Sequence, residues 1–574
     1  MSKSLKKMTK AITAAFLSLA QVQLLISPSV SADDSSSNNA VTLYGGWFEE
    51  AYAEWNSSVI GNNVNVSYAE KGSNEYISVD KELIREDRVD IPGLKGNTEY
   101  TLKIEGDKST QQCSVKTLSF DRSGYAHYNF QDIGAYKDDG TLKEDITVIY
   151  VTNENKDTVT YNGKTGIYNI FFSAKPKNVL FRFIGSIDVP SGTVPNDGSH
   201  NDGSNMLYLQ NSSNVTIEGI GDDTNLIEWG IEMKRCTSCE VRNLWLGKYP
   251  DDGISMTGNT EIRSAHIWVH NNTIEKGFNA YAGGEHVDED KADGDGSVDM
   301  KWSEYVTVSY NEFKDCHKTS LVGGKADQEQ DYITYHHNWF NNTSSRNPRA
   351  RNAHIHSFNN YFTTNSEYGI CASYNSKIFS ESNYFEKTNS PLYAINMGKD
   401  QFSGTIKSYN DKFVDCVPDE GLAYKIVDNR NDSPNIPNLI DGGEAYDNFD
   451  LNIYSYTVQT PDEARISIKQ YAGRMKCDNS TITESETEPV TEPVTEEPVT
   501  EPATESTTEA NSVVCDVNGD DVFNIADIVL FQKWLLAVPD TSIVNWESAD
   551  LCKDEKLDLF DLCEMRKLLI SSVK

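Results

Sequence analysis

Short runs of β-branched and aromatic residues recur through the middle of the chain, and each run is followed by asparagine. Examples are YVTVSYNEF, YITYHHNWF and HIHSFNNYF. The recurring asparagines lie at Asn272, Asn311, Asn338, Asn360 and Asn383, so the gaps are 39, 27, 22 and 23 residues. A period of 22 to 27 residues with one strand per repeat predicts a solenoid, here a parallel β-helix. Asparagines at one angular position can stack as a hydrogen-bonded ladder, and the 39-residue gap indicates one turn that carries an insertion.

The segments on either side of the repeat differ from it in composition. Residues 1–32 combine four lysines, an apolar run and Val-Ser-Ala, which predicts a secretory signal peptide and an extracellular protein. Residues 40–119 hold short alternating strands that predict a small β-sandwich, and LKGNTEYTLKI resembles the late strands of a fibronectin type III module. The β-helix is expected over 120–477. Residues 478–512 are rich in Thr, Glu and Pro and predict an extended linker.

The charge balance excludes some partners. The formal net charge is −36, so nucleic acid and anionic membrane surfaces, which need a basic face, are not expected. After residue 32 no stretch approaches the ~20 apolar residues of a membrane span, so membrane insertion is not expected either. Arg346, Arg349 and Arg351 nevertheless lie within six residues of one another. Cations gathered at one place in so acidic a chain point to an anionic ligand.

Residues 513–574 contain an internal duplication. A twelve-residue acidic loop begins at Asp516 and returns 34 residues later at Asp550, and an apolar helix pattern follows each copy. Oxygen side chains at fixed positions of such a loop suit Ca²⁺. The pair closely resembles a dockerin domain, the module that attaches plant cell-wall enzymes to the cohesin domains of a scaffold protein. The resemblance implies a cohesin partner, a place in a cellulosome, and calcium bound by Asp516, Asn518, Asp520, Asn524, Asp527, Asp550, Asp554, Asp558 and Asp561.

Charged residues also mark successive repeats of the predicted β-helix. Asp252 opens a strand-like segment, and Asp295 and Asp299 end the long insertion. Lys318 follows one repeat later, and Arg346 one repeat after that. Because residues one turn apart in a solenoid stack ~4.7 to 4.9 Å apart, these side chains can form one surface. Carboxylates packed that closely repel one another unless a cation such as Ca²⁺ bridges them.

Four motifs in this order, DGSVDMKWSEYVTVSYNEF, HKTSLVGG, TYHHNWFNN and SSRNPRARNAHIHSFNNYF, resemble a family 1 pectate lyase. The resemblance implies a mainly β protein with a right-handed parallel β-helix as its catalytic domain. It further implies Ca²⁺-dependent β-elimination on polygalacturonate, which yields 4,5-unsaturated ends. The implied roles are the base for Arg346, binding of the substrate for Lys318, Arg349 and Arg351, and binding of calcium for Asp252, Asp295 and Asp299.

Three other functions remain open from the sequence. A polygalacturonase-type hydrolase would also be a β-helix with clustered aspartates, and Asp251-Asp252 superficially fits it; the Gly-His-Gly and Arg-Ile-Lys motifs of that family are absent. A pectin lyase would lack the calcium carboxylates, so Asp295 and Asp299 argue against it. A non-catalytic pectin-binding β-helix protein would bind polygalacturonate without shortening it.

Overall fold

The structure is a computed structural model that describes the chain from residue 40 to 477, with gaps, and scattered residues beyond. The described ranges are 40–196, 205–324, 329–394, 402–417, 423–436 and 443–477, followed by 515, 517, 518, 523, 525–535 and ten single residues between 543 and 568. The predicted signal peptide and linker lie outside the described residues. The chain divides into two compact units, Met1–Thr481 and Ile482–Lys574. No described helix is long and apolar enough to span a membrane.

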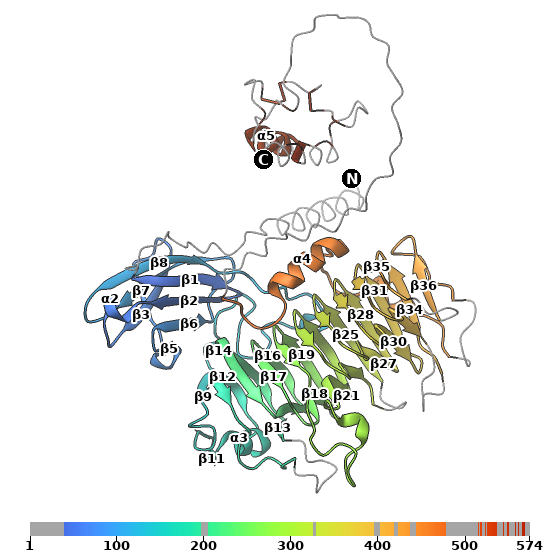
Figure 1. The fold of residues 1–574 in the computed structure, drawn as a ribbon, viewed down its shortest axis with the longest axis horizontal. Coiled ribbons are helices and arrows are strands. Elements are labelled where there is room, and N and C mark those ends of the chain that lie inside the picture. Colours follow the sequence, from blue (N-terminus) through green and yellow to red (C-terminus); the bar gives the residue numbers. More distant parts are fainter. Residues whose placement is uncertain are drawn as a thin grey trace, which may run out of the picture. The chain divides into compact units, whose positions relative to one another are not determined.

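Two four-stranded antiparallel sheets form the N-terminal part of the first unit, to the left in Figure 1. Alternating apolar residues such as Leu102 and Ile104 face one shared core, as the period of two predicts. The first sheet consists of β1 (Val41–Trp47), β2 (Glu50–Trp55), β6 (Arg88–Pro92) and β5 (Ile84–Arg85), and the second of β4 (Ile77–Ser78), β3 (Asn65–Glu70), β7 (Glu99–Glu105) and β8 (Thr110–Lys116), with the short helix α2 (Ser57–Ile60) beside them. The predicted sandwich is therefore confirmed, and its kinship with fibronectin type III modules stays a prediction.

The rest of the first unit is a coil of parallel strands, three to a turn, and the expected parallel β-helix is confirmed. We name its three stacks of strands A, B and C. Stack A contains β9 (Thr147–Val151), β12 (Lys177–Ile187), β14 (Ser213–Ile227), β16 (Thr237–Arg242), β19 (Ser264–His270), β22 (Ser303–Ser309), β25 (Gln330–His336), β28 (Ala353–Phe358), β31 (Lys377–Glu381), β34 (Thr405–Tyr409) and β36 (Tyr424–Val427).

Stack B begins with the ends of β12 and β14 and continues through β17 (Trp245–Gly247), β20 (Thr273–Glu275), β23 (Glu312–Lys314), β26 (Trp339–Asn341), β29 (Tyr361–Thr363), β32 (Tyr384–Glu386) and β35 (Lys412–Val414). Stack C contains β13 (Met206–Gln210), β15 (Gly230–Lys234), β18 (Asp252–Thr257), β21 (Gly296–Lys301), β24 (Leu321–Val322), β27 (Arg349–Arg351), β30 (Ile370–Ser373) and β33 (Leu392–Ala394). Helix α3 (Ile167–Ser173) lies near the first turns, and α4 (Pro461–Tyr471) packs on β29 and β32.

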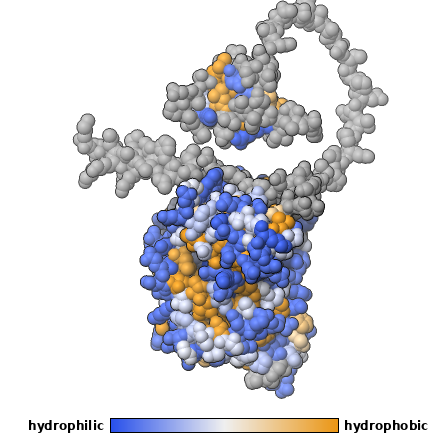
Figure 2. All heavy atoms as spheres, turned by 90° about the vertical axis from the view of Figure 1, so that its left-hand side faces the viewer, coloured by the Kyte–Doolittle hydropathy of each residue, from blue (hydrophilic) through white to orange (hydrophobic). Residues whose placement is uncertain are grey.

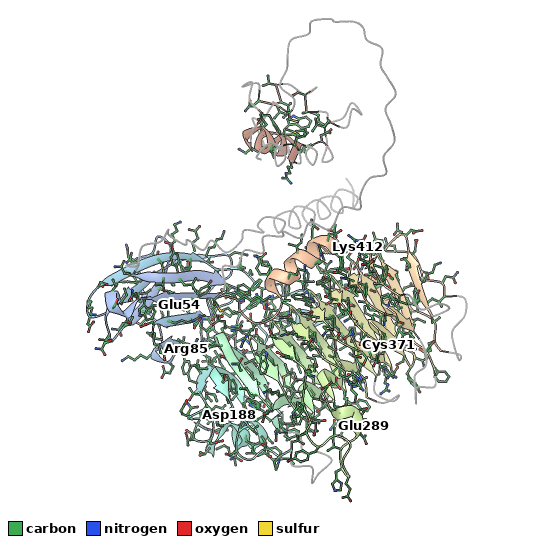
Figure 3. All side chains as sticks on the ribbon, in the orientation of Figure 1. Glu54, Arg85, Asp188, Glu289, Cys371 and Lys412 are labelled. Carbon is green, nitrogen blue, oxygen red and sulfur yellow. The ribbon has the colours of Figure 1, made fainter. Side chains whose placement is uncertain are left out.

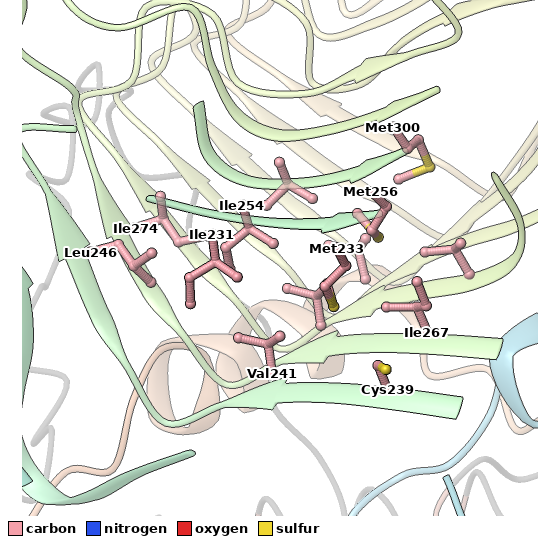
Figure 4. Packing of buried hydrophobic residues seen from close by; sticks show 14 of the residues in the cluster. Ile231, Met233, Cys239, Val241, Leu246, Ile254, Met256, Ile267, Ile274 and Met300 are labelled. Atoms are coloured by element: carbon pink, nitrogen blue, oxygen red, sulfur yellow. The ribbon is translucent and has the colours of Figure 1, made fainter. Parts of the chain in front are cut away.

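Aliphatic side chains from all three stacks fill the coil. Figure 4 shows them pointing inward, with Val241 from stack A, Ile274 from stack B, and Met256 and Met300 from stack C. Phenylalanines add a continuous stack of rings along stack B: the centroids of Phe313, Phe340, Phe362, Phe385 and Phe413 are 4.4 to 5.2 Å apart. Such a core excludes a shift of one residue in the register between turns, which would turn its side chains outward, but it is non-directional and distinguishes less sharply between shifts of two residues.

The asparagine ladder is present as predicted and supplies that register. The side-chain amide of each member donates to the side-chain oxygen of the next at 2.9 to 3.1 Å, from Asn272 through Asn311, Asn338 and Asn360 to Asn383. The ladder continues one turn further than the repeat of asparagines indicated, because Asn383 donates to the carboxylate of Asp411 at 3.1 Å. Each amide also donates to a backbone carbonyl of the preceding turn, as Asn338 does to Val308 at 2.8 Å.

A covering segment, residues 119–146 between β8 and β9, runs along the outside of stack A. Threonine hydroxyls of three turns hold its backbone: Thr216 accepts from Ala135 at 2.8 Å, Thr307 from Ala126 at 3.0 Å and Thr334 from Tyr125 at 3.1 Å.

The surface of the molecule on the left of Figure 1 is mostly hydrophilic, with hydrophobic residues gathered near its middle (Figure 2).

All eight described cysteines are free thiols, and Cys236 and Cys239 are both buried. In the second unit, α5 (Ile525–Leu535) contributes Ile528 and Phe531 to a small apolar cluster with Cys515, Val517, Ala549 and Met565.

Replacing the middle of the ladder tests its contribution to stability. We expect Asn338→Ala to lower the free energy of unfolding by about 1–3 kcal/mol, because the backbone N–H of Asn311 loses its buried acceptor and the Val308 carbonyl loses a buried donor. Asn431→Ala, at an exposed position, is the matched control and should change little. Urea unfolding measures both; equal midpoints for the two variants would show that the ladder adds no stability.

Candidate functional site

Three carboxylates meet on adjacent strands of stack C. Asp252 opens β18 and pairs in register with Gly296 of β21, so Asp295 lies beside it one turn later. One carboxylate oxygen from each of Asp251, Asp252 and Asp295 lies within 4.8 Å of the other two. Convergent carboxylate oxygens of this kind suit a hard divalent cation, which binds oxygen ligands at about 2.3–2.6 Å in the case of Ca²⁺.

Asp299 lies two pairs further along β21, opposite Ser255, and its side chain is 3% exposed. It accepts a hydrogen bond from the Leu321 backbone at 2.8 Å, and the Arg346 guanidinium lies 4.0 Å from its Oδ2. Gly296 makes room for it, since a Cβ there would be 2.4 Å from Asp299 Oδ1. The structure therefore places Asp299 close to both the three carboxylates and Arg346.

The ionisation of these groups shows how strongly they interact. Burial, followed by the neighbouring carboxylates of Asp299 and Asp251, raises the pKa of Asp252 well above its ordinary value. Burial also raises the pKa of Asp299 to about 6, although Arg346 opposes the shift. Burial works in the same direction on Asp295, but Lys291 and Lys318 outweigh it and lower the pKa of that carboxyl to about 2. Carboxylates crowded in this way are stabilised in their charged forms only by cations.

Lys291 is a cation that the chain itself supplies. It ends the short helix η3 (Glu289–Lys291) of the long insertion, which Figure 3 marks by its neighbour Glu289. Its ammonium lies 2.8 Å from Asp251 Oδ1 and 3.1 Å from Asp295 Oδ2. In this structure the Lys291 ammonium thus supplies the positive charge between two members of the cluster.

The predicted cations lie along the neighbouring strands. Lys318, whose side chain is 8% exposed, contacts Asp290 at 2.7 Å and Asp295 at 3.2 Å. Arg346, in a left-handed backbone conformation with φ of 61°, donates to the Asp295 carbonyl at 3.4 Å. The structure thus brings Asp295, Lys318 and Arg346 together, as the repeat spacing predicts.

Arg349 and Arg351 flank the buried Ala350 on β27, so their side chains leave the strand on one side of the sheet. Arg349 lies opposite Leu321 of β24 and donates to the Ser373 hydroxyl at 3.5 Å. Arg351 lies opposite Ser373 of β30 and donates to the Gly324 carbonyl at 3.2 Å. β27 therefore lies next to β24, the strand that follows Lys318, and two strands along the stack from β21, which carries Asp299.

The roles assigned from the sequence did not include two residues that the structure places in the site. Asp251 joins the carboxylates, and Lys291 bridges them, yet neither belongs to a repeated strand. The adjacency of Asp251 to Asp252 was the one available signal, because neighbouring carboxylates in a turn can both reach one ion. Nothing in the sequence of the insertion indicates that Lys291 contacts these carboxylates.

The calcium loops of the predicted dockerin lie largely outside the described residues, which include Asn518, Asp527 and Asp561 but not the other six candidates. Asp527 is buried, and its Oδ1 accepts hydrogen bonds from the backbones of Val517 at 3.0 Å and Asn518 at 3.3 Å. These bonds tie the start of the first loop to the helix that follows it. The dockerin assignment itself stays a prediction.

The fold and the site define a class: a parallel β-helix with a carboxylate cluster beside basic residues on one stack of strands. Residues 208–477 match the family model described as pectate lyase. A pectate trisaccharide-lyase of Bacillus licheniformis is 32% identical over 204 residues, which cover 35% of this chain and 56% of the relative. Pectate lyase C of Dickeya chrysanthemi is 27% identical over 263 residues, which cover 45% of this chain and 66% of the relative.

The matched part spans less than two thirds of either relative. Among solved structures, a pectate lyase from Bacillus sp. N165 in complex with trigalacturonate aligns with a TM-score of 0.45 and 24% identity, over 62% of this chain and 99% of that one. The family model and the relatives together support the pectate lyase family for the β-helix.

Removing the Lys291 ammonium tests whether the carboxylates form a cation site. We expect Lys291→Ala to tighten Ca²⁺ binding roughly fivefold, because the ion no longer displaces an ion pair worth about 1 kcal/mol. Calorimetric titration with Ca²⁺ measures the change. Lys276→Ala is the control, since Lys276 lies on the same insertion and pairs with Asp293 at 3.4 Å instead. Weaker binding in Lys291→Ala would show that Lys291 supports the ion rather than competes with it.

Proposed function

We propose that this chain is a secreted pectate lyase, which cleaves (1→4)-α-D-galacturonan by Ca²⁺-dependent β-elimination. The observation that carries the proposal is the arrangement on stack C, where Asp251, Asp252 and Asp295 adjoin Lys318 and Arg346. Polygalacturonate carries one carboxylate per residue, so a cleft for it needs cations along one line. The β-helix provides such a line because each turn adds one strand in register.

The residues divide into two groups by their chemistry. Asp251, Asp252 and Asp295 would hold the calcium ion, with Asp299 beside them. When bound, Ca²⁺ neutralises the uronate carboxylate and makes the adjacent C5 proton more acidic. Lys318 and Arg351 would hold substrate carboxylates, and Arg349 would keep the cleft basic. Arg is suited to this task because its planar fork matches a carboxylate in a bidentate fashion.

Arg346 is the proposed base. Its guanidinium lies beside the Asp295 carbonyl and near Asp299, at the junction between the carboxylates and the basic residues. In its neutral form it would remove the proton at C5; the C5–H electrons then form the C4=C5 double bond as the C4–O bond breaks, and the leaving oxygen takes a proton from solvent. A guanidine accepts a proton only after it has lost its own, so activity is expected to rise toward alkaline pH.

A hydrolase is the competing activity. Hydrolysis of this bond needs one carboxyl group as acid and a second as base or nucleophile, with about 5–9.5 Å between them. The cluster on stack C has its carboxylates closer together and bridged by a lysine, which favours cation binding over acid–base work. The polygalacturonase-type and purely binding alternatives are therefore less well supported than the lyase.

Attachment to a scaffold is the second part of the proposal. The duplicated acidic loops of residues 513–574 support a dockerin that binds a cohesin domain in the presence of Ca²⁺. The Thr/Glu/Pro-rich stretch of 478–512 has the composition of a linker that would separate it from the β-helix.

Two measurements on one reaction test the lyase. Polygalacturonate incubated with the protein at alkaline pH should give products that absorb in the band of unsaturated uronates, and a chelator should abolish this signal. Chain shortening without that absorbance would identify a hydrolase, and binding without shortening would identify a non-catalytic protein.

Substitution of the proposed base gives a more specific test. We expect Arg346→Lys to lower the rate about 10²–10⁴-fold, the usual contribution of general base catalysis, because the ammonium cannot occupy the same position. Arg465→Lys is the control: its guanidinium lies 5.2 Å over the Tyr384 ring, on α4. Rates and their pH profiles should be compared for both variants. An unchanged rate at every pH in Arg346→Lys would remove Arg346 from the role of base.

A further inference from the structure

A second group of ligand-type side chains lies at the corner between stacks A and B, away from stack C. His336 ends β25 and His337 follows it, and their side chains are fully buried and 2% exposed respectively. Asp121 reaches them from the covering segment. One ligand atom from each of these three residues lies within 4.8 Å of the other two.

The hydrogen bonds of the two imidazoles determine where their protons are. Nε2 of His336 lies 3.1 Å from the Ser123 carbonyl, which can only accept, so this nitrogen carries the proton. Nε2 of His337 lies 3.1 Å from the side-chain oxygen Oε1 of Gln459, and it too is the donor. The remaining nitrogens, Nδ1 of His336 and Nδ1 of His337, face each other at 3.0 Å. With both Nε2 atoms protonated, two lone pairs point at one place and repel unless a positive charge lies between them.

Two imidazole nitrogens with free lone pairs and one carboxylate oxygen are the donor set that a transition-metal ion requires.

The rings are held in this orientation by packing. His337 stacks on Tyr310 with centroids 4.6 Å apart and an angle of 6°, and His336 stacks on Phe358 at 4.9 Å and 12°. Asp121 Oδ1 accepts from the Ser123 backbone at 2.9 Å, and its Oδ2 lies 3.9 Å from His336 Nδ1. Ligands about 2.0–2.2 Å from a tetrahedral ion are about 3.3–3.6 Å apart. The observed separations of 3.0 and 3.9 Å lie on either side of that range.

We propose that Asp121, His336 and His337 form a site for a divalent transition ion, with Zn²⁺ as the best match, through the two Nδ1 atoms and a carboxylate oxygen. Imidazole nitrogen suits Zn²⁺, Cu²⁺ or Ni²⁺, whereas Ca²⁺ takes oxygen ligands, so this site differs in kind from the one on stack C. The Nε2 donors to Ser123 and Gln459 are the outer hydrogen bonds that fix metal-binding histidines. The side chain of Asp121 is 31% exposed and gives the ion a way in.

The ion would join three parts of the chain. Asp121 belongs to the covering segment, the histidines to the turn between β25 and β26, and Gln459 to the residues just before α4. Metal binding would therefore fasten the covering segment and the residues before α4 to the coil, in the same turn as β27, the strand that carries Arg349 and Arg351. The proposal does not depend on the lyase activity.

The test uses the whole chain, saturated with Ca²⁺ so that its oxygen sites are filled, and titrated with Zn²⁺ by calorimetry. Asp121→Asn should weaken Zn²⁺ binding by more than about tenfold, the lower end of the loss caused by removing even an outer partner. His337→Asn should remove one equivalent altogether; asparagine tolerates the left-handed φ of 52° at this position. His266→Asn is the matched control, because His266 shares that φ of 52° and also stacks on a tyrosine, at 4.8 Å from Tyr305.

Thermal unfolding gives a second readout that separates binding from folding. In the unmodified chain Zn²⁺ should raise the midpoint, and Asp121→Asn should keep the metal-free midpoint but lose that rise. Should His337→Asn fail to fold, Asp121→Asn decides the matter. Equal Zn²⁺ binding in the unmodified chain and in Asp121→Asn would overturn the proposal, and the histidines would then be a hydrogen-bonded pair with the Gln459 amide reversed.

Discussion

The fixed register between successive turns of the β-helix is the constraint on which the rest of the structure depends. Parallel strands pair residue by residue along each stack, and the ladder from Asn272 to Asp411 locks the corner between stacks A and B at one angular position. A slip of one residue would turn the inward apolar side chains toward solvent, and it would also break every bond of the ladder. The ladder therefore aligns residues that recur in the sequence in one straight column along the coil.

That column is what makes a charged site possible on stack C. Asp252, Asp295, Lys318 and Arg346 span 94 positions in the sequence, yet they lie close together on successive turns of the coil. Carboxylates and cations would not gather so densely on a flexible surface, since the repulsion between Asp252 and Asp299 would drive them apart. The rigid coil holds them in place, and the insertion that carries Lys291 supplies the compensating charge.

The sequence was sufficient to predict those features that depend on the repeat. The period of the asparagines predicts the parallel coil, and the same period brings Asp295, Lys318 and Arg346 together. It could not predict contributions from outside the repeat. Lys291 lies in an insertion with no counterpart in other turns, and Asp121 lies in a segment whose path is set by threonine hydroxyls on distant strands. The sequence also did not predict that the ladder ends at Asp411. The last member of the ladder needs only to accept a hydrogen bond, so this position does not have to be asparagine.

A crystal structure of the protein with Ca²⁺ and an oligogalacturonate tests the central claim most directly. The account predicts an ion between the carboxylates of Asp251, Asp252 and Asp295, with the Lys291 ammonium displaced. It also predicts uronate carboxylates against Lys318 and Arg351, and Arg346 within hydrogen-bonding distance of a C5 carbon. An oligosaccharide bound on another face of the coil, or bound over stack C with no ion among those aspartates, would contradict it.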